Sequence, residues 1–184
     1  MTVPPAGSER ESVVSRLTAA LRVVPDFPRP GILFRDITTL VGDAALFHDA
    51  VDELANACRP GPLDAVVGIE ARGFLLGGAV AYVLGAGFVP VRKQGRLPAA
   101  VESVAYSLEY GEAILEMHTD ALEAGHRLVI VDDLLATGGT ASATVDLVER
   151  MGATVSRLVF LVELAGLGGA ARLGGHPHTS IITI

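Results

Sequence analysis

Two adjacent carboxylates and a loop of glycines and threonines follow an apolar stretch of the chain. Residues 127–140 read RLVIVDDLLATGGT, so Asp132 and Asp133 end a run of branched side chains. Glycines allow positive φ and close backbone approach, and consecutive backbone N–H groups can then surround an anion. A helix that begins near Thr140 adds its dipole and its unpaired N–H groups. The segment therefore predicts a site for one phosphate group.

The two aspartates indicate what else the ligand contains. Carboxylates beside a phosphate repel it unless they accept hydrogen bonds from hydroxyls or engage a metal ion, and a sugar phosphate supplies the hydroxyls. A P-loop is excluded because the sequence has no Gly-x-x-x-x-Gly-Lys-Ser/Thr motif. The plainer alternative is a tight turn that Asp133 caps.

These residues need a scaffold that brings loops together at one edge of a sheet. Branched, strand-like runs alternate with helical segments: we expect strands at 63–70, 88–93, 126–133 and 155–164, and helices from 8 to near 25 and at 43–58, 73–84 and 140–151. Such alternation is typical of an α/β fold whose mostly parallel, twisted sheet is flanked by helices. Ligands bind at the carboxyl ends of such strands. The long polar interruption at 94–118 is expected to form a projecting hairpin.

Composition narrows the class of protein. With 184 residues, half of them hydrophobic, we expect a single domain over 1–184. The net charge of −7 argues against a nucleic-acid partner. Residues 74–91 are uncharged, but their glycines and Pro90 favour a buried helix and strand over a membrane span. The single cysteine, Cys58, and the absence of a secretory signal pattern favour the cytoplasm.

The apolar strand and its loop, 128–140, resemble the phosphoribosyl pyrophosphate signature of type I phosphoribosyltransferases. Four further segments occur in the order found in adenine phosphoribosyltransferases: PGILFRDITTL (30–40), EARGF (70–74), VPVRKQGRLP (89–98) and YSLEYG (106–111). The resemblance extends over about residues 25–165. It implies the type I phosphoribosyltransferase fold, adenine and phosphoribosyl pyrophosphate as substrates, AMP and pyrophosphate as products, Mg²⁺ as cofactor, and a homodimer.

The resemblance also assigns residues to the sugar phosphate and to pyrophosphate. Asp132 and Asp133 contact the ribose hydroxyls, while no residue binds Mg²⁺ directly: the substrates hold the ion, and these two aspartates reach it through water at most. Arg72 acts in catalysis and binds pyrophosphate, for which arginine's two-pronged geometry is suited. A second basic group, in which the family usually has lysine at the last position, comprises Arg92, Lys93 and Arg96. The 5′-phosphate is assigned to Ala136, Thr137, Gly138, Gly139 and Thr140.

The remaining assignments concern the base and the reacting centre. Phe34, with Leu33 and Arg35, is expected to form one face of an adenine pocket, and Leu164 the opposite face. By resemblance, residues 1–40 include a hood over the adenine, and 92–117 form a lid hairpin that carries the catalytic Glu109. The plainer interpretations are a core residue for Phe34, a surface salt bridge for Arg72, a solvated basic turn for 92–96, and a rim carboxylate on an exposed hairpin for Glu109.

Two other functions are weighed against this one. A regulator that senses phosphoribosyl pyrophosphate and contacts DNA should carry a basic helix-turn-helix, for which the N-terminal helix lacks length and charge. An enzyme for guanine, hypoxanthine or xanthine is the nearer rival. The GLGGAA segment (166–171) matches a loose dinucleotide fingerprint, but no second strand with a ribose-binding acid follows it. His176 and His178 lack further metal ligands, and Cys58 lacks an adjacent base.

Overall fold

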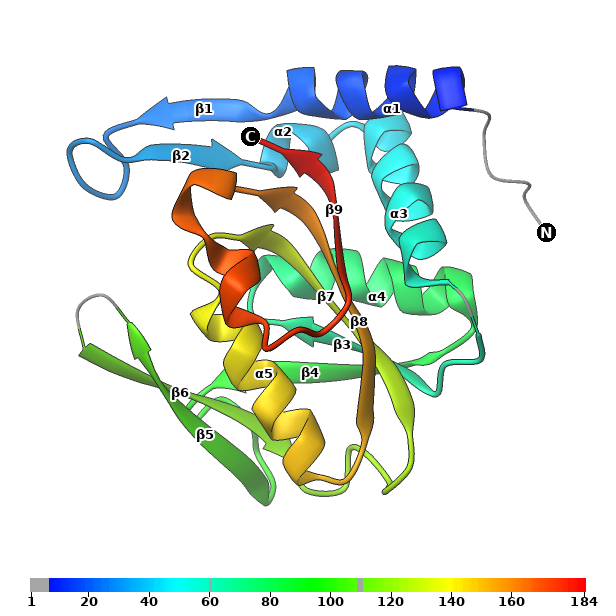
Figure 1. The fold of residues 1–184 in the computed structure, drawn as a ribbon, viewed down its shortest axis with the longest axis vertical. Helices are drawn as coiled ribbons and strands as arrows, with labels where there is room; N and C mark the ends of the chain where they lie inside the picture. The colour runs from blue at the N-terminus through cyan, green and yellow to red at the C-terminus, as the bar shows by residue number, and fades with distance from the viewer. Residues whose placement is uncertain (1–6, 60, 109–110) are drawn as a thin grey trace.

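A seven-stranded sheet forms the centre of the computed structural model, which describes residues 7–59, 61–108 and 111–184 (Figure 1). The strands lie in the order β5-β6-β4-β3-β7-β8-β9. Their bounds are β3 Ala65–Ile69, β4 Gly87–Lys93, β5 Val101–Leu108, β6 Gly111–His118, β7 Arg127–Leu135, β8 Thr154–Glu163 and β9 His178–Thr183. The pairs β4–β3, β3–β7, β7–β8 and β8–β9 are parallel, whereas β4–β6 and β5–β6 are antiparallel. The predicted α/β class with a mostly parallel sheet is confirmed.

Helices cover both faces of this sheet, and the sheet separates two hydrophobic cores. On one face pack α1 (Gly7–Ala20), α3 (Ala44–Cys58) and α4 (Arg72–Leu84), and on the other packs α5 (Gly139–Arg150). Successive strand residues serve the two cores in turn: Val66 packs against the α3 and α4 side, and Val67 against the α5 side. Every residue of β3 is buried, which is why the parallel strands read as continuous apolar runs.

The helix boundaries follow from their end residues. Asp43 caps α3, with its Oδ1 accepting from the N–H groups of Ala45 and Leu46 at 3.0 Å each. Gly85 ends α4 in the left-handed conformation at φ 66°, and β4 begins two residues later. This break divides the uncharged segment 74–91 as predicted. Among the described residues, no helix is long and apolar enough to cross a membrane.

The N-terminal segment differs from the sequence-based prediction in one respect. We expected the first helix to continue to near Pro25, but α1 ends at Ala20 and residues 22–25 form strand β1 (Arg22–Pro25). β1 pairs antiparallel with β2 (Leu33–Asp36), in a register that sets Val24 opposite Phe34. The branched residues Val23 and Val24 fit a helical period and a strand equally well, and pairing with β2 decides between them. A short helix, α2 (Thr38–Val41), follows β2.

The long interruption before β7 is an antiparallel hairpin, β5–β6, at one edge of the sheet (Figure 1). Its eight residue pairs run from Val101 opposite His118 to Leu108 opposite Gly111. β6 is joined to β4 only at Arg92 and Lys93, so the far end of the hairpin extends beyond the sheet. After β8 come two short 3₁₀ helices, η1 (Ala165–Leu167) and η2 (Gly169–Arg172), and then β9.

Candidate active site

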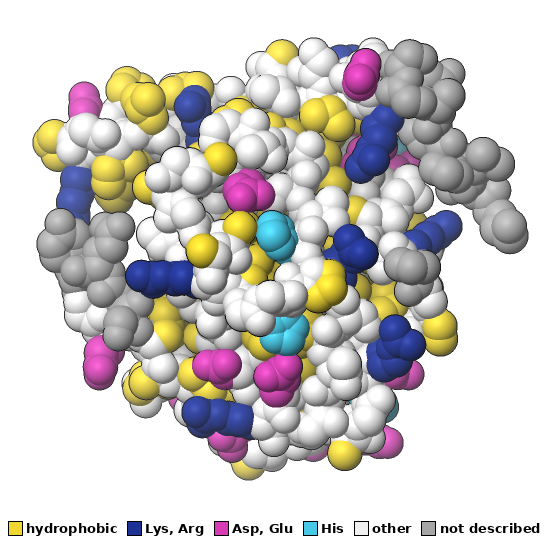
Figure 2. All heavy atoms as spheres, in the orientation of Figure 1, with side chains coloured by type: hydrophobic (Ala, Val, Ile, Leu, Met, Phe, Trp, Pro, Cys, Tyr) yellow, Lys and Arg dark blue, Asp and Glu magenta, His cyan; other side chains and the backbone are white. Residues whose placement is uncertain are grey.

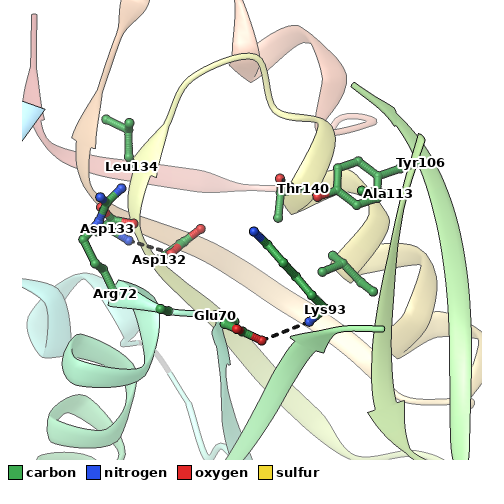
Figure 3. A pocket seen from close by; sticks show the side chains of 11 residues that line it. Glu70, Arg72, Lys93, Tyr106, Ala113, Asp132, Asp133, Leu134 and Thr140 are labelled. Carbon is green, nitrogen blue, oxygen red and sulfur yellow. Dashed lines mark hydrogen bonds and ion pairs between the residues drawn. The ribbon is translucent and has the colours of Figure 1, made fainter. Parts of the chain in front are cut away.

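A cleft of about 480 Å³ lies at the carboxyl ends of β3 and β7, where ligands bind in open α/β sheets. Figure 3 shows that residues from both strand ends, from the start of α4, from the end of β4 and from the hairpin meet there. The side chains that line it come from Glu70, Arg72, Lys93, Tyr106, Asp132, Asp133 and Thr140, among others. The sequence-predicted residues of the phosphate, ribose and pyrophosphate sites are thus represented in one cavity.

The start of α5 forms a smaller hollow of about 90 Å³ beside this cleft. Gly138 has φ 78° and no side chain caps the helix, so the first N–H groups of α5 are left without an intrahelical partner. Gly139 is already the first helical residue and does not have positive φ. All five residues predicted to hold the 5′-phosphate line the hollow, together with Asp132: Ala136, Thr137, Gly138, Gly139 and Thr140. The hollow has the size and the donor groups that one phosphate needs.

A second glycine, outside the predicted site, supports this loop from behind. A Cβ atom on Gly169 would lie 2.3 Å from the backbone oxygen of Ala136, and a Cβ atom on Gly138 would lie 2.4 Å from the backbone oxygen of Gly169. Both distances are too short for any other residue, so the loop and η2 touch backbone to backbone. Gly169 belongs to the GLGGAA segment, whose glycines here permit close packing. Sequence analysis missed this role, although the glycine pair itself was a signal of close approach.

The two aspartates at the end of β7 have different surroundings. Asp133 is buried, with its side chain 8% exposed, and forms an ion pair with Arg72. Asp132 is half-buried in the cleft, and its Oδ1 accepts the N–H of Asp133 at 2.9 Å. Burial and then the negative charge of Asp133 raise the pKa of Asp132 well above its ordinary value of 3.8. Asp132 is therefore the carboxylate that gains most from a hydroxyl donor or a cation.

Arg72 connects the aspartates to the N-terminal hairpin. Its Nε bonds to Oδ2 of Asp133, while its guanidinium carbon lies 5.2 Å from the centre of the Phe34 ring. That distance is within the range of a cation–π interaction. The side chain predicted to bind pyrophosphate thus stands between the carboxylate pair and the aromatic ring predicted to stack on the base.

None of the residues predicted to bind adenine lines the cleft, and among them only Phe34 lies against a residue that does, Arg72. Side chains alternate along β2, so Phe34 lies on the opposite face from Leu33 and Arg35, and these two can read a base only through their backbone. Phe27 packs edge-on against Phe34, with the two ring centroids 5.1 Å apart. This residue was not predicted from the sequence. Leu164 lies directly after β8, where its N–H bonds to the Leu135 oxygen at 2.9 Å, and it is not among the residues that line the cleft.

The predicted basic group at 92–96 does not act as one unit, because side chains alternate along β4 and Arg92 and Lys93 therefore point to opposite faces. Lys93 lines the cleft, and Figure 3 shows its side chain pointing into the space between Asp132 and Thr140. Arg92 instead donates to the backbone oxygen of Arg96 at 2.9 Å and to Glu70 Oε2 at 3.3 Å, and neither arginine lines the cleft.

Glu70, another residue that sequence analysis did not assign, holds this strand end in place. Its Oε2 also accepts the backbone N–H of Lys93 at 3.1 Å, so one carboxylate orients both basic residues at the end of β4. Glu70 lies within the quoted EARGF motif, which was the available signal. The peptide between Glu70 and Ala71 is cis.

The hairpin reaches the predicted phosphate loop, residues 136–140, through a tyrosine. The Thr140 hydroxyl lies 3.4 Å from the Tyr106 hydroxyl, to which it donates, and both residues line the cleft. At the base of the hairpin, buried Glu116 accepts the N–H of Gly95 at 2.8 Å, which fixes the turn after β4. Glu109, the predicted catalytic carboxylate, lies outside the described residues.

The residues rejected as sites have other surroundings in the structure. The Nε2 atom of His176 lies 3.5 Å from Oε1 of Glu149, and His178 is exposed. The described residues contain no group of three or more His, Cys, Asp or Glu that could hold a metal ion. Burial raises the pKa of Cys58 to about 12, which keeps its thiol neutral and unreactive.

Comparisons with known proteins agree in one family. A model of the phosphoribosyl transferase domain matches residues 42–172. The chain is 54% identical over 164 residues to the adenine phosphoribosyltransferase of Chelativorans sp. (strain BNC1), covering 89% of this chain and 91% of that protein. It is also similar to the crystal structure of adenine phosphoribosyltransferase from Rhodothermus marinus DSM 4252, with a TM-score of 0.91, 47% identity, and coverage of 95% and 99% of the two chains.

A further solved structure carries bound molecules. The Saccharomyces cerevisiae adenine phosphoribosyltransferase, complexed with D-2,5-dideoxy-2,5-imino-altritol 1,6-bisphosphate and adenine, matches with a TM-score of 0.88 and 39% identity. The match covers 93% of this chain and 99% of the yeast chain.

The contact between Gly169 and the phosphate loop leads to a first prediction. Gly169→Ala should destabilise the fold by about 1–3 kcal/mol, because backbone atoms must move to admit the methyl group. It should also weaken binding of phosphoribosyl pyrophosphate by about tenfold or more, since the loop N–H groups move with Ala136. Gly166→Ala is the matched control, because no atom lies within 4 Å of a Cβ at that position. Equal binding by the two variants, measured by calorimetry, would show that the loop does not depend on this packing.

The raised pKa of Asp132 leads to a second prediction with a defined sign. The protonated carboxyl favours the folded state, and this contribution is fully present below the ordinary pKa of 3.8 and is lost as pH rises through the raised value. Asp132→Asn should therefore raise the melting temperature of the free protein at pH 8 by about 2–4 °C per kcal/mol gained, and this difference should vanish toward pH 4. Exposed Asp146→Asn is the control for charge alone. A variant that is less stable than the wild type at pH 8 would contradict the argument.

Proposed function

Because the chain belongs to the phosphoribosyltransferase family, we propose that it transfers the phosphoribosyl group of phosphoribosyl pyrophosphate to adenine, giving AMP and pyrophosphate in purine salvage. The observation that carries this function is the position of Arg72. It pairs with Asp133 on one side and faces the Phe34 ring on the other, so a site for a sugar phosphate adjoins a flat apolar surface for a base. An enzyme that forms an N-glycosidic bond needs these two sites next to each other.

Different residues of the cleft bind different parts of phosphoribosyl pyrophosphate. The first N–H groups of α5 hold the 5′-phosphate, and the carboxylates of Asp132 and Asp133 accept the ribose hydroxyls. Arg72 and Lys93 meet the pyrophosphate, while Arg92 and Arg96 add positive charge nearby. In the transfer, N9 of adenine forms a bond to the anomeric carbon as the bond from that carbon to pyrophosphate breaks, and the N9 proton passes to the carboxylate of Glu109. The sugar passes through an oxocarbenium-like state that nearby carboxylates stabilise.

Arg72 must change partners for this to occur. In the structure its charge is engaged by Asp133, yet Asp133 is also needed for the ribose. Arrival of pyrophosphate oxygens gives the guanidinium a second anionic partner, so Asp133 can turn to the ribose hydroxyls. This exchange occurs beside Phe34, on whose ring the base would stack.

Mg²⁺ fits the site as an ion held by the substrates. Within the described residues no group of three or more His, Cys, Asp or Glu side chains could hold a metal ion, and Asp132 offers a carboxylate oxygen inside the cleft. Mg²⁺ prefers oxygen ligands and keeps several waters, so Asp132 and Asp133 would reach the ion through water. When bound, the ion neutralises charge that develops on the leaving pyrophosphate.

Two segments complete the proposed enzyme. Within 1–40, the β1–β2 hairpin acts as a hood over the adenine, and Phe34 and Leu164 are the two faces of the base site. Within 92–117, the β5–β6 hairpin acts as a lid that excludes water from the reacting centre. The contact of Tyr106 with Thr140 supports this role, because it ties the lid to the phosphate loop.

The enzyme is further proposed to be a homodimer that works in the cytoplasm. One side of α4 carries large exposed apolar residues: Leu75 is 53% and Tyr82 is 89% exposed. No charged residue occurs in α4 after Arg72, which favours a second copy of the chain as the partner of this face. The cytoplasm suits a protein whose one cysteine, Cys58, is a buried free thiol.

The dimer leads to a prediction about mass in solution. Leu75→Glu should convert the dimer to a monomer of 19.1 kDa in light scattering, because it places a charge within the apolar face. Leu167→Glu is the matched control, since Leu167 is a leucine of similar exposure, 51%, on η1. A wild-type chain that is already monomeric at micromolar concentration would refute the proposal.

The function itself is tested by AMP formation from adenine, phosphoribosyl pyrophosphate and Mg²⁺, beside reactions with hypoxanthine, guanine or xanthine. Turnover confined to adenine is expected. Turnover with another base would retain the phosphoribosyl site and overturn the base assignment. Binding of phosphoribosyl pyrophosphate with no turnover on any base would favour the sensor function instead.

The same assay tests Glu109. We expect Glu109→Gln to lower kcat by about a hundredfold with little change in substrate binding, which is the effect of losing one acid–base group. The neighbouring carboxylate variant Glu112→Gln is the control, because Glu112 is exposed on the same hairpin. A Glu109→Gln enzyme with near-normal kcat would remove Glu109 from the mechanism.

A further inference from the structure

A second pocket, of about 330 Å³, lies between α1, α3 and the first residues of β8 and β9. Its polar lining comprises Arg10, Glu53, Asn56, Arg59, Arg157 and Thr179. The pocket lies at the amino ends of the parallel strands, whereas the cleft lies at their carboxyl ends. From Arg157 near the start of β8 to Glu163 at its end, the strand extends about 20 Å.

The backbone directs the two strand residues into this pocket. Arg157 precedes Val159 and Leu161 by two and four positions, and these two residues pack in the core on the α1 and α3 side. Arg157 therefore points to the same side, and its Nη1 donates to the Thr179 Oγ1 at 2.8 Å across the parallel pair β8–β9.

Positive charge in the pocket exceeds negative charge. Glu53 is buried, 4% exposed, and its carboxylate accepts from Arg10 Nε at 2.9 Å. Within the described residues Arg59 makes no side-chain ion pair, and Arg157 bonds to the neutral hydroxyl of Thr179. Two guanidinium charges thus have no carboxylate of their own.

The thiol next to Arg157 gives no compensating charge. Burial raises the pKa of Cys58 to about 12, although Arg157 acts in the opposite direction, so this thiol is neutral at pH 7.

The charge around the pocket differs from that of the whole chain. Figure 2 shows several Lys and Arg side chains on the side of the molecule that carries α3. In a chain of net charge −7, a pocket lined by three arginines and one glutamate is a local exception. The catalytic cleft has the opposite balance, with Glu70, Asp132 and Asp133 against Arg72 and Lys93.

We propose that this pocket binds a phosphate dianion, either inorganic phosphate or the phosphate group of a small monoester. The guanidinium groups of Arg59 and Arg157 match phosphate oxygens in geometry and charge. The Thr179 hydroxyl accepts from Arg157 and keeps its own proton to donate, and the Asn56 amide supplies further donors. The volume of 330 Å³ falls at the small end of ligand pockets and leaves room for an organic group.

The test is a titration of the full-length protein, followed by NMR of arginine Nε–H and backbone amide signals. Inorganic phosphate and glycerol 3-phosphate are the two probes. We expect signals of Asn56, Arg59, Arg157 and Thr179 to shift with either probe, independently of those of the phosphate loop at 136–140. Tighter binding of glycerol 3-phosphate would identify a monoester as the ligand, and equal binding would identify phosphate itself.

Variants decide whether the arginines hold the ion. The double change Arg59→Gln with Arg157→Gln should weaken the response by about tenfold or more, and Arg157→Lys, which keeps the charge, should weaken it less. Arg16→Gln is the matched control, because it removes the same charge from α1 at an arginine that pairs with Asp49 and does not line the pocket. An unchanged phosphate-loop response reports that each variant is folded. Shifts confined to the phosphate loop, or a double variant that responds like the wild type, would overturn the proposal.

Discussion

The arrangement of the cleft depends on the ion pair between Arg72 and Asp133. Arg72 begins α4 after β3, and Asp133 lies in the adjacent strand β7, so the pair joins two neighbouring strand ends. A carboxylate as buried as Asp133 needs such a partner, since an uncompensated buried charge costs several kcal/mol. The same guanidinium lies on Phe34, so the position of the N-terminal hairpin is tied to this pair. A ligand that engages Arg72 therefore acts on the proposed ribose site and the proposed base site together.

The charges of the cleft explain how an acidic chain can bind an anionic substrate. Its carboxylates outnumber its basic side chains, so the net side-chain charge of the cleft does not attract the 5′-phosphate. The 5′-phosphate site that we propose is built instead from backbone N–H groups at the start of α5, which carry partial positive charge without any lysine or arginine. The carboxylates then become useful, because they select a ligand that also carries hydroxyls. Asp132, with its raised pKa, gains most from such a ligand.

The sequence predicts the parallel core well because burial on both faces gives an unambiguous apolar pattern. Strands β3, β7 and β8 and helices α3 to α5 are found within two residues of their expected bounds. Strand β1 was wrongly assigned to a helix, because Val23 and Val24 satisfy both periods and the pairing with β2 is a non-local contact. Strand alternation explains why Arg92 and Lys93 point to opposite faces. Which of the two faces the cleft became clear only from the pairing of β4 with β6. Spacing placed the phosphate loop and the aspartates in one cavity, whereas the orientation of Arg72 toward Phe34 came only from the folded structure.

Glycine motifs show why residue types alone leave part of the site unseen. The sequence contains two glycine-rich turns after apolar strands, 138–139 and 166–169. From the residue types alone, either turn could bind a ligand. In the structure the first presents its N–H groups to a hollow, and the second places Gly169 against the back of the first, at a distance that no Cβ would allow. A glycine reports that something approaches closely, but what approaches is set by the fold. The two turns thus form one structural unit, in which packing of Gly169 fixes the backbone conformation at Gly138, where we propose that the phosphate binds.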